Sequence, residues 1–352
     1  MKGAKKSGWG WVQGQGLVFS ALGMVLLLSG PAALQGGAEG QGGRFEFGLI
    51  GDQQYDAESE AKFSHLMEDL NQADLAFVVH TGDFKGGQLC SDGLFSRRKN
   101  EFQASRHPWI YTPGDNEWTD CHRLYMGRYD PRERLARLRE IFFSGDRSLG
   151  QRALALERQS GDSKYAKFSE NVRWTYSNVL FVTLHIVGSN NNLGRSSEMD
   201  AEYQERNAAN LAWLRQALDL ARRDRMRGIM LIMQANPFFE DTWSSSRRES
   251  LRIAPPDRQR SGYSDFLSAL ERETVTSGMP VVLVHGEAHY FRIDKPMFSS
   301  TSKRMVENFT RVETFGVPDV HWVRALVDPK DPNLFTFKPE IVKKNLVDHR
   351  SP

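Results

Sequence analysis

The stretch that decides the fold runs from residue 75 to residue 83 and reads LAFVVHTGD. Its apolar part is typical of a strand buried on both faces, and the chain then turns at a Gly-Asp pair. Two other strand-like segments, at 45–50 and 109–112, end in the same way. The aspartates that follow the three strands are Asp83, Asp52 and Asp115. We therefore predict a sheet whose strand ends each deliver a carboxylate.

Outside these segments, helical and strand-like patterns alternate along the chain. Amphipathic helices are expected at 59–72, 95–105, 130–143, 200–225 and 264–276. Further strands are expected at 172–176, 179–187, 229–233 and 281–284, with antiparallel strands in the tail at 309–337. Residues 144–170 are predicted to be rich in loops, and the polar, basic segment 244–260 is predicted to be an exposed insertion. The alternation predicts a single α/β domain over 44–340.

The ends of five strands carry polar side chains that would meet at one edge. In open α/β sheets, the binding crevice forms where strands end and their loops leave. Carboxylates brought together there repel one another unless a cation lies between them. A single Gly-Asp turn is common without any function, so the prediction rests on the ordered set. That set is Asp52, Gln54, Asp83, Asp115, Asn116, Gln234, Glu287 and His289.

The order of these motifs resembles that of the calcineurin-like metallophosphoesterase family. The motifs here are Gly51-Asp52-Gln53-Gln54, Gly82-Asp83, Gly114-Asp115-Asn116-Glu117, Gln234 and Gly286-Glu287-Ala288-His289. The family pattern is Asp-x-His, Gly-Asp, Gly-Asn-His-Glu/Asp, a lone His and Gly-His-x-His. The resemblance spans about residues 45–295. It implies a four-layer α/β/β/α sandwich and a binuclear phosphoester hydrolase, in which a metal-activated water attacks phosphorus.

Three residues match the family directly: Asp52, Asp83, which stands at the bridging aspartate, and His289. Five family positions carry a different residue here, namely Gln54, Asp115, Asn116, Gln234 and Glu287. By analogy, the ligands of one metal are Asp52, Gln54, Asp83 and His289. The ligands of the other are Asp83, Asp115, Gln234 and Glu287. Sliding the third motif would align Asn116 with the ligand asparagine, but the ungapped alignment also matches Pro113, Gly114 and Glu117, and we prefer it.

These replacements change the expected chemistry of the site. The second ligand set contains only oxygen, which favours Mg²⁺, Mn²⁺ or Ca²⁺ over Zn²⁺, with one or two ions bound. Four carboxylates would also neutralise two dications. A neutral site attracts a phosphate dianion less strongly, and it acidifies a bound water less, than the net positive site of the family.

The catalytic candidates are Asn116, Glu117 and His285. Asn116 stands at the catalytic histidine, but an amide cannot act as a titrating acid. Glu117 or His122 could take that role, and Lys85 or Arg123 could hold an anionic substrate; local pairing is the other interpretation of each. His285 is expected either to line the site or to be a structural histidine. His80 and His185 are interpreted as core histidines.

Two functions remain open. The first is an enzyme, a metal-dependent hydrolase acting on a phosphate-containing small molecule. The second is a catalytically weak or inactive metal-binding protein on the same scaffold. A net charge of only +2 gives no reason to expect nucleic acid. Neither a Gly-x-Gly-x-x-Gly turn after the first strand nor a Gly-x-Ser-x-Gly elbow is present in the sequence.

The first residues predict export. Lys2, Lys5 and Lys6 precede an apolar run at 17–29 and a small-residue stretch at 30–43. This order is typical of a secretory signal peptide, expected at 1–38, with an uncleaved anchor as the alternative. The mature protein would be periplasmic or secreted, without a stable membrane span. Export permits a disulfide between Cys90 and Cys121, which both follow loops that the resemblance places near each other; two free thiols are the alternative.

Overall fold

The computed structural model describes residue 10 and residues 43–238 and 261–347. Apart from Gly10, the expected signal peptide at 1–38 lies outside the described residues, as does the expected insertion at 244–260. The fold below is that of the described residues within Gly37–Pro352. Among the described residues, no helix is long and apolar enough to cross a membrane.

The first sheet has the strand order β12-β11-β1-β2-β3. Its strands are β1 (Phe45–Ile50), β2 (Val78–His80), β3 (Trp109–Tyr111), β11 (Trp322–Val327) and β12 (Phe335–Glu340). β1, β2 and β3 run parallel to one another. β11 runs antiparallel to β1, and β12 antiparallel to β11. The three strands that precede Asp52, Asp83 and Asp115 therefore end at the same edge of one sheet.

The second sheet has the order β4-β5-β6-β7-β8-β10-β9. Its strands are β4 (Glu157–Arg158), β5 (Val172–Tyr176), β6 (Val179–Thr183), β7 (Gly228–Ile232), β8 (Val281–His285), β9 (Arg292–Asp294) and β10 (Phe309–Glu313). β6, β7, β8 and β10 are parallel. The ends of β7 and β8 lead directly to Gln234 and Glu287.

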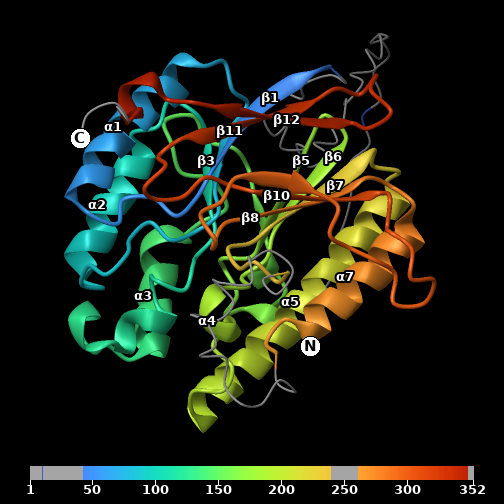
Figure 1. The fold of residues 1–352 in the computed structure, drawn as a ribbon. Helices are drawn as coiled ribbons and strands as arrows, with labels where there is room; N and C mark the ends of the chain where they lie inside the picture. Colours follow the sequence, from blue (N-terminus) through green and yellow to red (C-terminus); the bar gives the residue numbers. More distant parts are fainter. Residues whose placement is uncertain (1–9, 11–42, 239–260, 348–352) are drawn as a thin grey trace, which may run out of the picture. The chain divides into compact units, whose positions relative to one another are not determined.

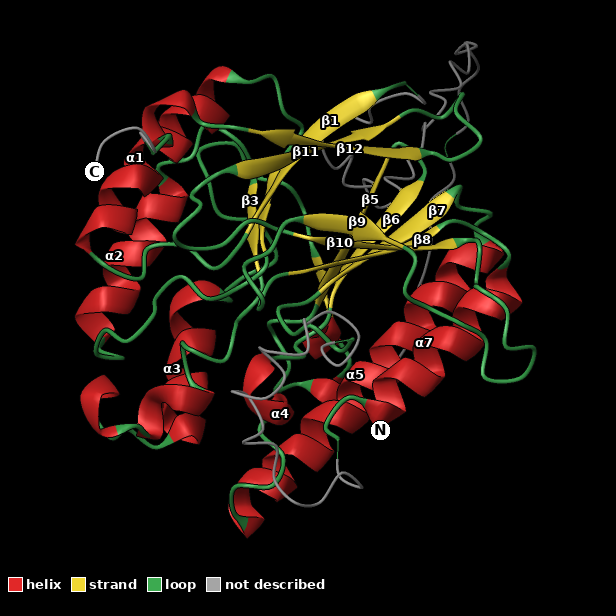
Figure 2. Cartoon of the chain, viewed as in Figure 1, coloured by secondary structure: helices red, strands yellow, loops and turns green. Residues whose placement is uncertain are grey.

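Helices cover the outer face of each sheet, as Figures 1 and 2 show. The helices on the side of the first sheet are α1 (Ala57–Gln72), α2 (Asp92–Gln103) and α3 (Pro131–Phe142), and those on the second are α5 (Ser197–Arg223) and α7 (Ser264–Ser277). Because each sheet must bury both faces, helices outside and the partner sheet inside give four layers. The expected α/β/β/α sandwich is confirmed.

Alternating side chains on the strands build this layering. On β1, Phe47 and Leu49 point toward the second sheet, whereas Ile50 packs with the helices α1 to α3. On β7, Met230 and Ile232 point back toward the first sheet. Successive residues of a strand face opposite sides. The central strands β6, β7 and β8 therefore consist mostly of apolar residues.

Most predicted elements are confirmed, and the differences lie in strand direction and in where some elements begin or end. The hairpin of β5 and β6 turns at Ser177 and Asn178, whose φ angles of 46° and 61° are those of a left-handed turn. The tail is not wholly antiparallel as expected: β10 pairs in parallel with β8. The alternation of apolar and polar residues does not show whether neighbouring strands run parallel or antiparallel. α5 begins at Ser197, three residues earlier than expected, because Ser196 caps it through Met199 N–H.

A buried ion pair links α3 to the segment that precedes β5. Arg139 of α3 donates to both carboxylate oxygens of Glu170, at 2.8 and 2.6 Å, and His185 Nδ1 lies 2.8 Å from the same carboxylate. Glu170 and His185 are fully buried, which confirms His185 as a core histidine. Burial would raise the pKa of Glu170, but the charge of Arg139 and the hydrogen bond with His185 outweigh it and hold this pKa well below its usual range.

We expect Glu170→Gln to lower the free energy of unfolding by about 3 kcal/mol near pH 7, because Arg139 loses its buried partner. The pKa of Glu170 is lower in the folded than in the unfolded chain. The charge therefore contributes stability above the unfolded value of 4.5 and loses that contribution as the pH falls below it. Urea unfolding near pH 7 and near pH 3 should show a smaller difference between variant and parent in acid.

The matched control is Glu205→Gln, because Glu205 pairs with Lys167 at an exposed position. Glu205→Gln should lower the free energy of unfolding by less than about 0.5 kcal/mol. If Glu170→Gln lowered the free energy of unfolding equally at both pH values, the expected link between stability and the ionisation of Glu170 would be contradicted.

Candidate metal centre

Strands from both sheets bring their following loops to one place. Asp52, Asp83 and Asp115 come from the first sheet, and Glu287 comes from the second. Two contacts link the sheets here: Glu287 N–H donates to both oxygens of Asp52, at 3.2 and 3.1 Å, and Gln234 Nε2 donates to Asp83 Oδ2 at 3.1 Å. The predicted convergence of these strand ends is therefore present in the fold.

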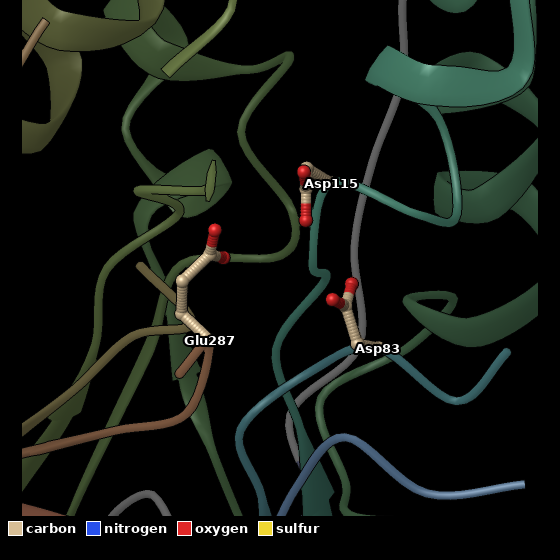
Figure 3. A group of neighbouring side chains, drawn as sticks. All are labelled: Asp83, Asp115 and Glu287. Carbon is tan, nitrogen blue, oxygen red and sulfur yellow. The ribbon is translucent and has the colours of Figure 1, made fainter. Parts of the chain in front are cut away.

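Three carboxylates form the centre of this group. Asp83, Asp115 and Glu287 each offer an oxygen, and these three atoms lie within 4.8 Å of one another. Figure 3 shows the three carboxylates arranged around a common space. Asp83 and Asp115 are buried, and Glu287 is half-buried. Such a group suits a hard divalent cation, because carboxylate oxygens are its preferred ligands.

Burial and mutual repulsion make these carboxylates hard to ionise without a cation. Burial raises the pKa of Asp52 to about 6 and that of Asp115 to about 7. Burial, together with the neighbouring carboxylates, raises the pKa values of Asp83 and Glu287 well above their usual range. Each carboxylate thus increases the cost of charging the others.

The backbone at the site is in an unusual conformation. The φ angles of Asp52, Asp83, Glu287 and His289 are 53°, 55°, 80° and 59°, all in the left-handed region. A non-glycine residue there costs of order 1 kcal/mol, and such residues concentrate at functional sites. Gly82, with φ of 109°, makes room as well, since a Cβ would approach the backbone of Gly114. The turns thus direct the carboxylates toward one another, although their left-handed backbone lowers the stability of the fold.

Asp83 accepts from four donors. Asn116 N–H reaches Oδ1 at 3.1 Å. The donors to Oδ2 are Asn116 Nδ2 at 3.0 Å, Gln234 Nε2 at 3.1 Å and Tyr55 O–H at 3.2 Å. These contacts draw together three of the predicted site residues. They also place Asn116, the residue at the position of the family's catalytic histidine, directly beside Asp83.

The two glutamines expected as ligands have their amides engaged. Gln54 Nε2 donates to Glu101 of α2 at 2.8 Å, and its Oε1 is buried without a hydrogen-bond partner among the described residues. Gln234 turns its nitrogen toward the group and donates to Asp83 and Glu287. Its oxygen accepts from Gly188 N–H at 2.6 Å. In this arrangement Gln234 presents hydrogens, not a lone pair, to the carboxylates.

His289 is oriented as metal-binding histidines usually are. Its Nδ1 lies 2.7 Å from the carbonyl oxygen of Val317 and must donate to it. In the neutral ring, Nε2 is then an acceptor, and it faces Asp52 Oδ1 at 3.6 Å. A carbonyl that accepts from one ring nitrogen, and so fixes the orientation of the ring, is common around metal-binding histidines.

The other catalytic candidates lie in the core. Glu117 is fully buried and accepts from Phe84 N–H at 2.8 Å and from Tyr111 O–H at 3.2 Å. His285 is fully buried with its Nδ1 2.8 Å from Gly286 O, and burial lowers its pKa to about 3. His80 is also fully buried, as expected. Lys85 is buried too, and its Nζ donates to the carbonyls of Gly86 and Asn116.

The sequence analysis missed two side chains that enter the site. Tyr55 places its hydroxyl 3.2 Å from Asp83 and 3.4 Å from Asp52. The sequence could have indicated Tyr55, because it lies three residues after Asp52 in the same turn. Ser189 donates to Asp115 at 2.8 Å and to Asp120 at 2.9 Å. Ser189 is far from both in sequence, so no local pattern pointed to it.

Three observations fit a bound divalent cation. The oxygens of the three central carboxylates are close enough to share an ion. Asp115 Oδ1 is buried without a hydrogen-bond partner among the described residues. Asp52 and His289 Nε2 face each other as two acceptors. Since the ligands are nearly all oxygen, the chemistry of the donor set fits a hard ion.

Comparison with known proteins supports the fold. No family model matches the sequence, and no curated protein sequence matches it. A solved structure of PhoD superposes with a TM-score of 0.52 and 13% sequence identity, over 84% of this chain and 66% of that chain. The match therefore spans slightly less than two thirds of PhoD. The chain has the fold of the calcineurin-like metallophosphoesterases, which agrees with the order of its motifs.

Two further solved structures have TM-scores below 0.5 and support no inference. One is the 5′-nucleotidase from Candida albicans SC5314, with a TM-score of 0.43 and 10% identity, over 84% of this chain and 50% of that chain. The other is Vacuolar Protein Sorting 29 from Cryptosporidium parvum, with a TM-score of 0.31 and 11% identity, over 84% of this chain and 97% of that one.

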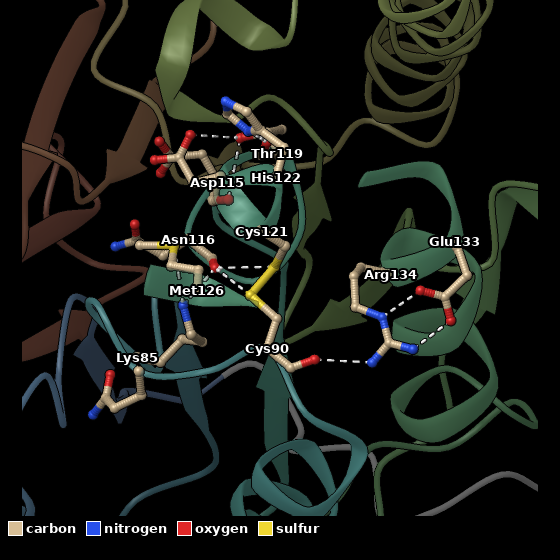
Figure 4. The surroundings of a disulfide bond; sticks show 12 residues. Lys85, Cys90, Asp115, Asn116, Thr119, Cys121, His122, Met126, Glu133 and Arg134 are labelled. Carbon is tan, nitrogen blue, oxygen red and sulfur yellow. Dashed lines mark hydrogen bonds and ion pairs between the residues drawn. A yellow bond between two sulfur atoms is a disulfide. The ribbon is translucent and has the colours of Figure 1, made fainter. Parts of the chain in front are cut away.

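A disulfide supports the loop that carries Asn116. Cys90 and Cys121 are bonded, which confirms the expected pairing. Both sulfurs lie 3.7 Å from the carbonyl oxygen of Asn116, to which Lys85 Nζ donates at 2.8 Å (Figure 4). Arg134 of α3 donates to the carbonyl of Cys90 at 2.9 Å. The loop is therefore fastened to the chain from several sides.

We expect the double change Cys90→Ala and Cys121→Ala to lower the free energy of unfolding by about 3 kcal/mol, because the bond closes a loop across a separation of 31 residues. Denaturant unfolding of both proteins measures the difference. Intact-mass analysis without reductant should show the parent chain with no reactive thiol, and two alkylatable thiols in exported protein would contradict the pairing.

Proposed function

We propose that this chain is an exported, metal-dependent hydrolase of phosphoesters. The observation that carries the proposal is the group formed by Asp83, Asp115 and Glu287, with Asp52 and His289 beside it. Carboxylates that repel one another at a strand-end crevice are costly unless they hold a cation. The likeness of fold and motif order points to phosphate esters as the substrate class. Small organic phosphates fit better than nucleic acid, because no broad basic surface is expected from the sequence.

The residues that would hold a cation are the three central carboxylates. The donor set favours Mg²⁺, Mn²⁺ or Ca²⁺. When bound, such an ion lowers the pKa of water and compensates the charge on phosphoryl oxygens. Asn116 donates to Asp83 through its backbone N–H and its Nδ2, and Nδ2 also donates to the Tyr55 oxygen at 3.3 Å, so its amide holds these two groups in place. It cannot supply the proton that the leaving group needs.

Two arginines would bind the anionic substrate. Asp120 pairs with Arg123 at 2.7 Å and with Arg195 at 3.6 Å, and it shares the hydroxyl of Ser189 with Asp115. This cluster therefore adjoins the carboxylate group and carries one net positive charge. Both arginines remain partly exposed, at 42% and 26% of their side chains. Guanidinium groups of this kind recognise phosphate oxygens through paired N–H donors.

The second candidate is a metal-binding protein with little catalytic power. The observation that favours it is the absence of a titrating group at Asn116, together with the deep burial of Glu117 and His285. Metal binding without turnover on any phosphomonoester or phosphodiester would favour this alternative over hydrolysis.

Export is part of the proposal. The positive start, the apolar run and the small-residue stretch support a signal peptide at 1–38. The bond between Cys90 and Cys121 agrees with an oxidising compartment. The intact-mass measurement described for the disulfide also reports whether these first residues have been removed.

Hydrolysis of phosphomonoesters and phosphodiesters should require Mg²⁺, Mn²⁺ or Ca²⁺, and chelation should abolish it. Asp83→Asn should lower kcat/KM by more than about 100-fold, because it removes a charge from the centre of the ligand group. A spectrophotometric assay with nitrophenyl esters across a panel of divalent metals measures this. Activity that survives Asp83→Asn in folded protein would remove this site from the mechanism.

Arg123→Gln should raise KM for a phosphomonoester by about 10-fold and leave kcat nearly unchanged, since one charged hydrogen bond to the substrate is lost. The matched control is Arg132→Gln, because Arg132 pairs with Asp130 on exposed α3. Steady-state kinetics on both variants separate a local contact from a general loss of positive charge. Similar KM values for the two variants would show that Arg123 does not touch the substrate.

A further inference from the structure

The amide of Gln234 can be oriented without ambiguity. Gly188 N–H is only a donor, so the Gln234 atom 2.6 Å from it must be the oxygen. The nitrogen therefore points the other way, where it donates to Asp83 Oδ2 at 3.1 Å and to Glu287. Both amide hydrogens are used, and the side chain is fully buried. A ligand histidine at this position would present a lone pair, and Gln234 presents hydrogens.

The donor that fixes this orientation is itself held rigidly. Gly188 begins the turn α4 (Gly188–Asn191), and the φ angles of residues 189 to 192 are 50°, 54°, 54° and 67°. Consecutive non-glycine residues in the left-handed region cost of order 1 kcal/mol each. Arg206, which is fully buried, offsets this cost by donating to His185 O at 2.9 Å, Asn191 Oδ1 at 2.6 Å and Asn191 O at 3.0 Å. Rotating the Gln234 amide would require this turn to move.

Gly188 also lies close to the carboxylate of Glu287. A Cβ at this position would collide with both carboxylate oxygens. A larger residue here would require the Glu287 side chain to shift. The turn, Gln234 and Glu287 thus form one tightly packed unit at the edge of the carboxylate group.

Asp83 is also poorly suited to bridge two ions. In the family pattern, the aspartate at this position shares its oxygens between two metals. Here Oδ2 already accepts from Gln234, Asn116 and Tyr55, and Oδ1 accepts from Asn116 N–H. A carboxylate oxygen has two lone pairs. The donors around Oδ2 therefore take the place that one of two bridged ions would have.

We propose that this chain holds a single divalent cation, on Asp83, Asp115 and Glu287, and that Gln234 is a positioning residue that aims two of these carboxylates at it. The proposal rests on the proposed function only in assuming that a cation binds. Two ligand histidines of the family pattern have become a donor, Gln234, and an acceptor, Glu287, which bond to each other. The exchange adds a third carboxylate to this ion position. The Tyr55 hydroxyl, 3.2 Å from Asp83 Oδ2 and 3.4 Å from Asp52 Oδ1, occupies part of the other position.

The experiment is a count of bound Mn²⁺ on the full mature chain. Isothermal titration calorimetry should give one ion per chain in the tight-binding phase. The electron paramagnetic resonance spectrum of the loaded protein should show the resolved hyperfine lines of an isolated Mn²⁺. Two tight ions per chain, or the exchange-broadened spectrum of a coupled pair, would overturn the proposal.

Variants then locate the ion. Asp115→Ala should abolish tight binding, whereas Asp219→Ala, which removes an exposed carboxylate on α5, should leave the affinity within about threefold of the parent. Glu287→Gln serves if Asp115→Ala does not fold, as judged by circular dichroism. Tight binding that survives in the folded variant would refute the assignment.

Gln234→Ala tests the positioning role. The dissociation constant for Mn²⁺ should rise by about 10- to 100-fold while the count stays at one, as for other outer-shell partners. The matched control is Gln159→Ala, a buried glutamine that donates to Ala209 O at 2.8 Å in the same fold. Both changes should lower the melting temperature, but only the first should weaken metal binding. Equal affinities in the two variants would exclude the positioning role.

These measurements do not depend on turnover. One bound ion with no hydrolysis would support this proposal and contradict the proposed function. Two bound ions together with hydrolysis would contradict this proposal and support the proposed function.

Discussion

The burial of four carboxylates at one edge of two sheets is the constraint on which the rest of this structure depends. Asp52, Asp83, Asp115 and Glu287 raise one another's pKa values, so each charge needs compensation close by. The fold supplies part of it as oriented N–H and O–H donors. A divalent cation would supply the remainder. Both kinds of compensation require the strand ends of the two sheets to face each other, which the apolar layer between the sheets ensures.

The backbone around this group is held in place by distant interactions. Left-handed residues occur in the turns after β1, β2 and β8, and four more follow one another in the turn at 189–192. These conformations persist because buried groups elsewhere determine them. Arg206 holds one turn, and the disulfide with Lys85 holds the loop of Asn116. The stability of the four-layer core thus supports a local geometry that would not form in an isolated peptide.

The residues that stand in place of the family's histidines all change the chemistry of the site in the same way. In place of neutral nitrogen ligands, the site contains carboxylates on one side and amide donors on the other. In the proposed function, this oxygen-rich donor set suits a hard cation better than zinc. It also explains why Asn116 and Gln234 share a neighbour in Asp83: each amide offsets part of the negative charge that the extra carboxylates introduce.

The sequence by itself determined the layers of this fold and predicted which polar residues would meet at the strand ends. Apolar runs ending in Gly-Asp set the parallel strands, and their order matched a known motif pattern, because strand ends and turn residues are local features. Strand direction in the tail, the contact of Gln54 with Glu101, and the entry of Tyr55 and Ser189 were decided only by the tertiary structure. So was the orientation of the Gln234 amide. Whether a glutamine offers oxygen or nitrogen to its neighbours depends on which donor lies behind it. Here that donor is Gly188, 46 residues away in the chain, and only packing brings the two together.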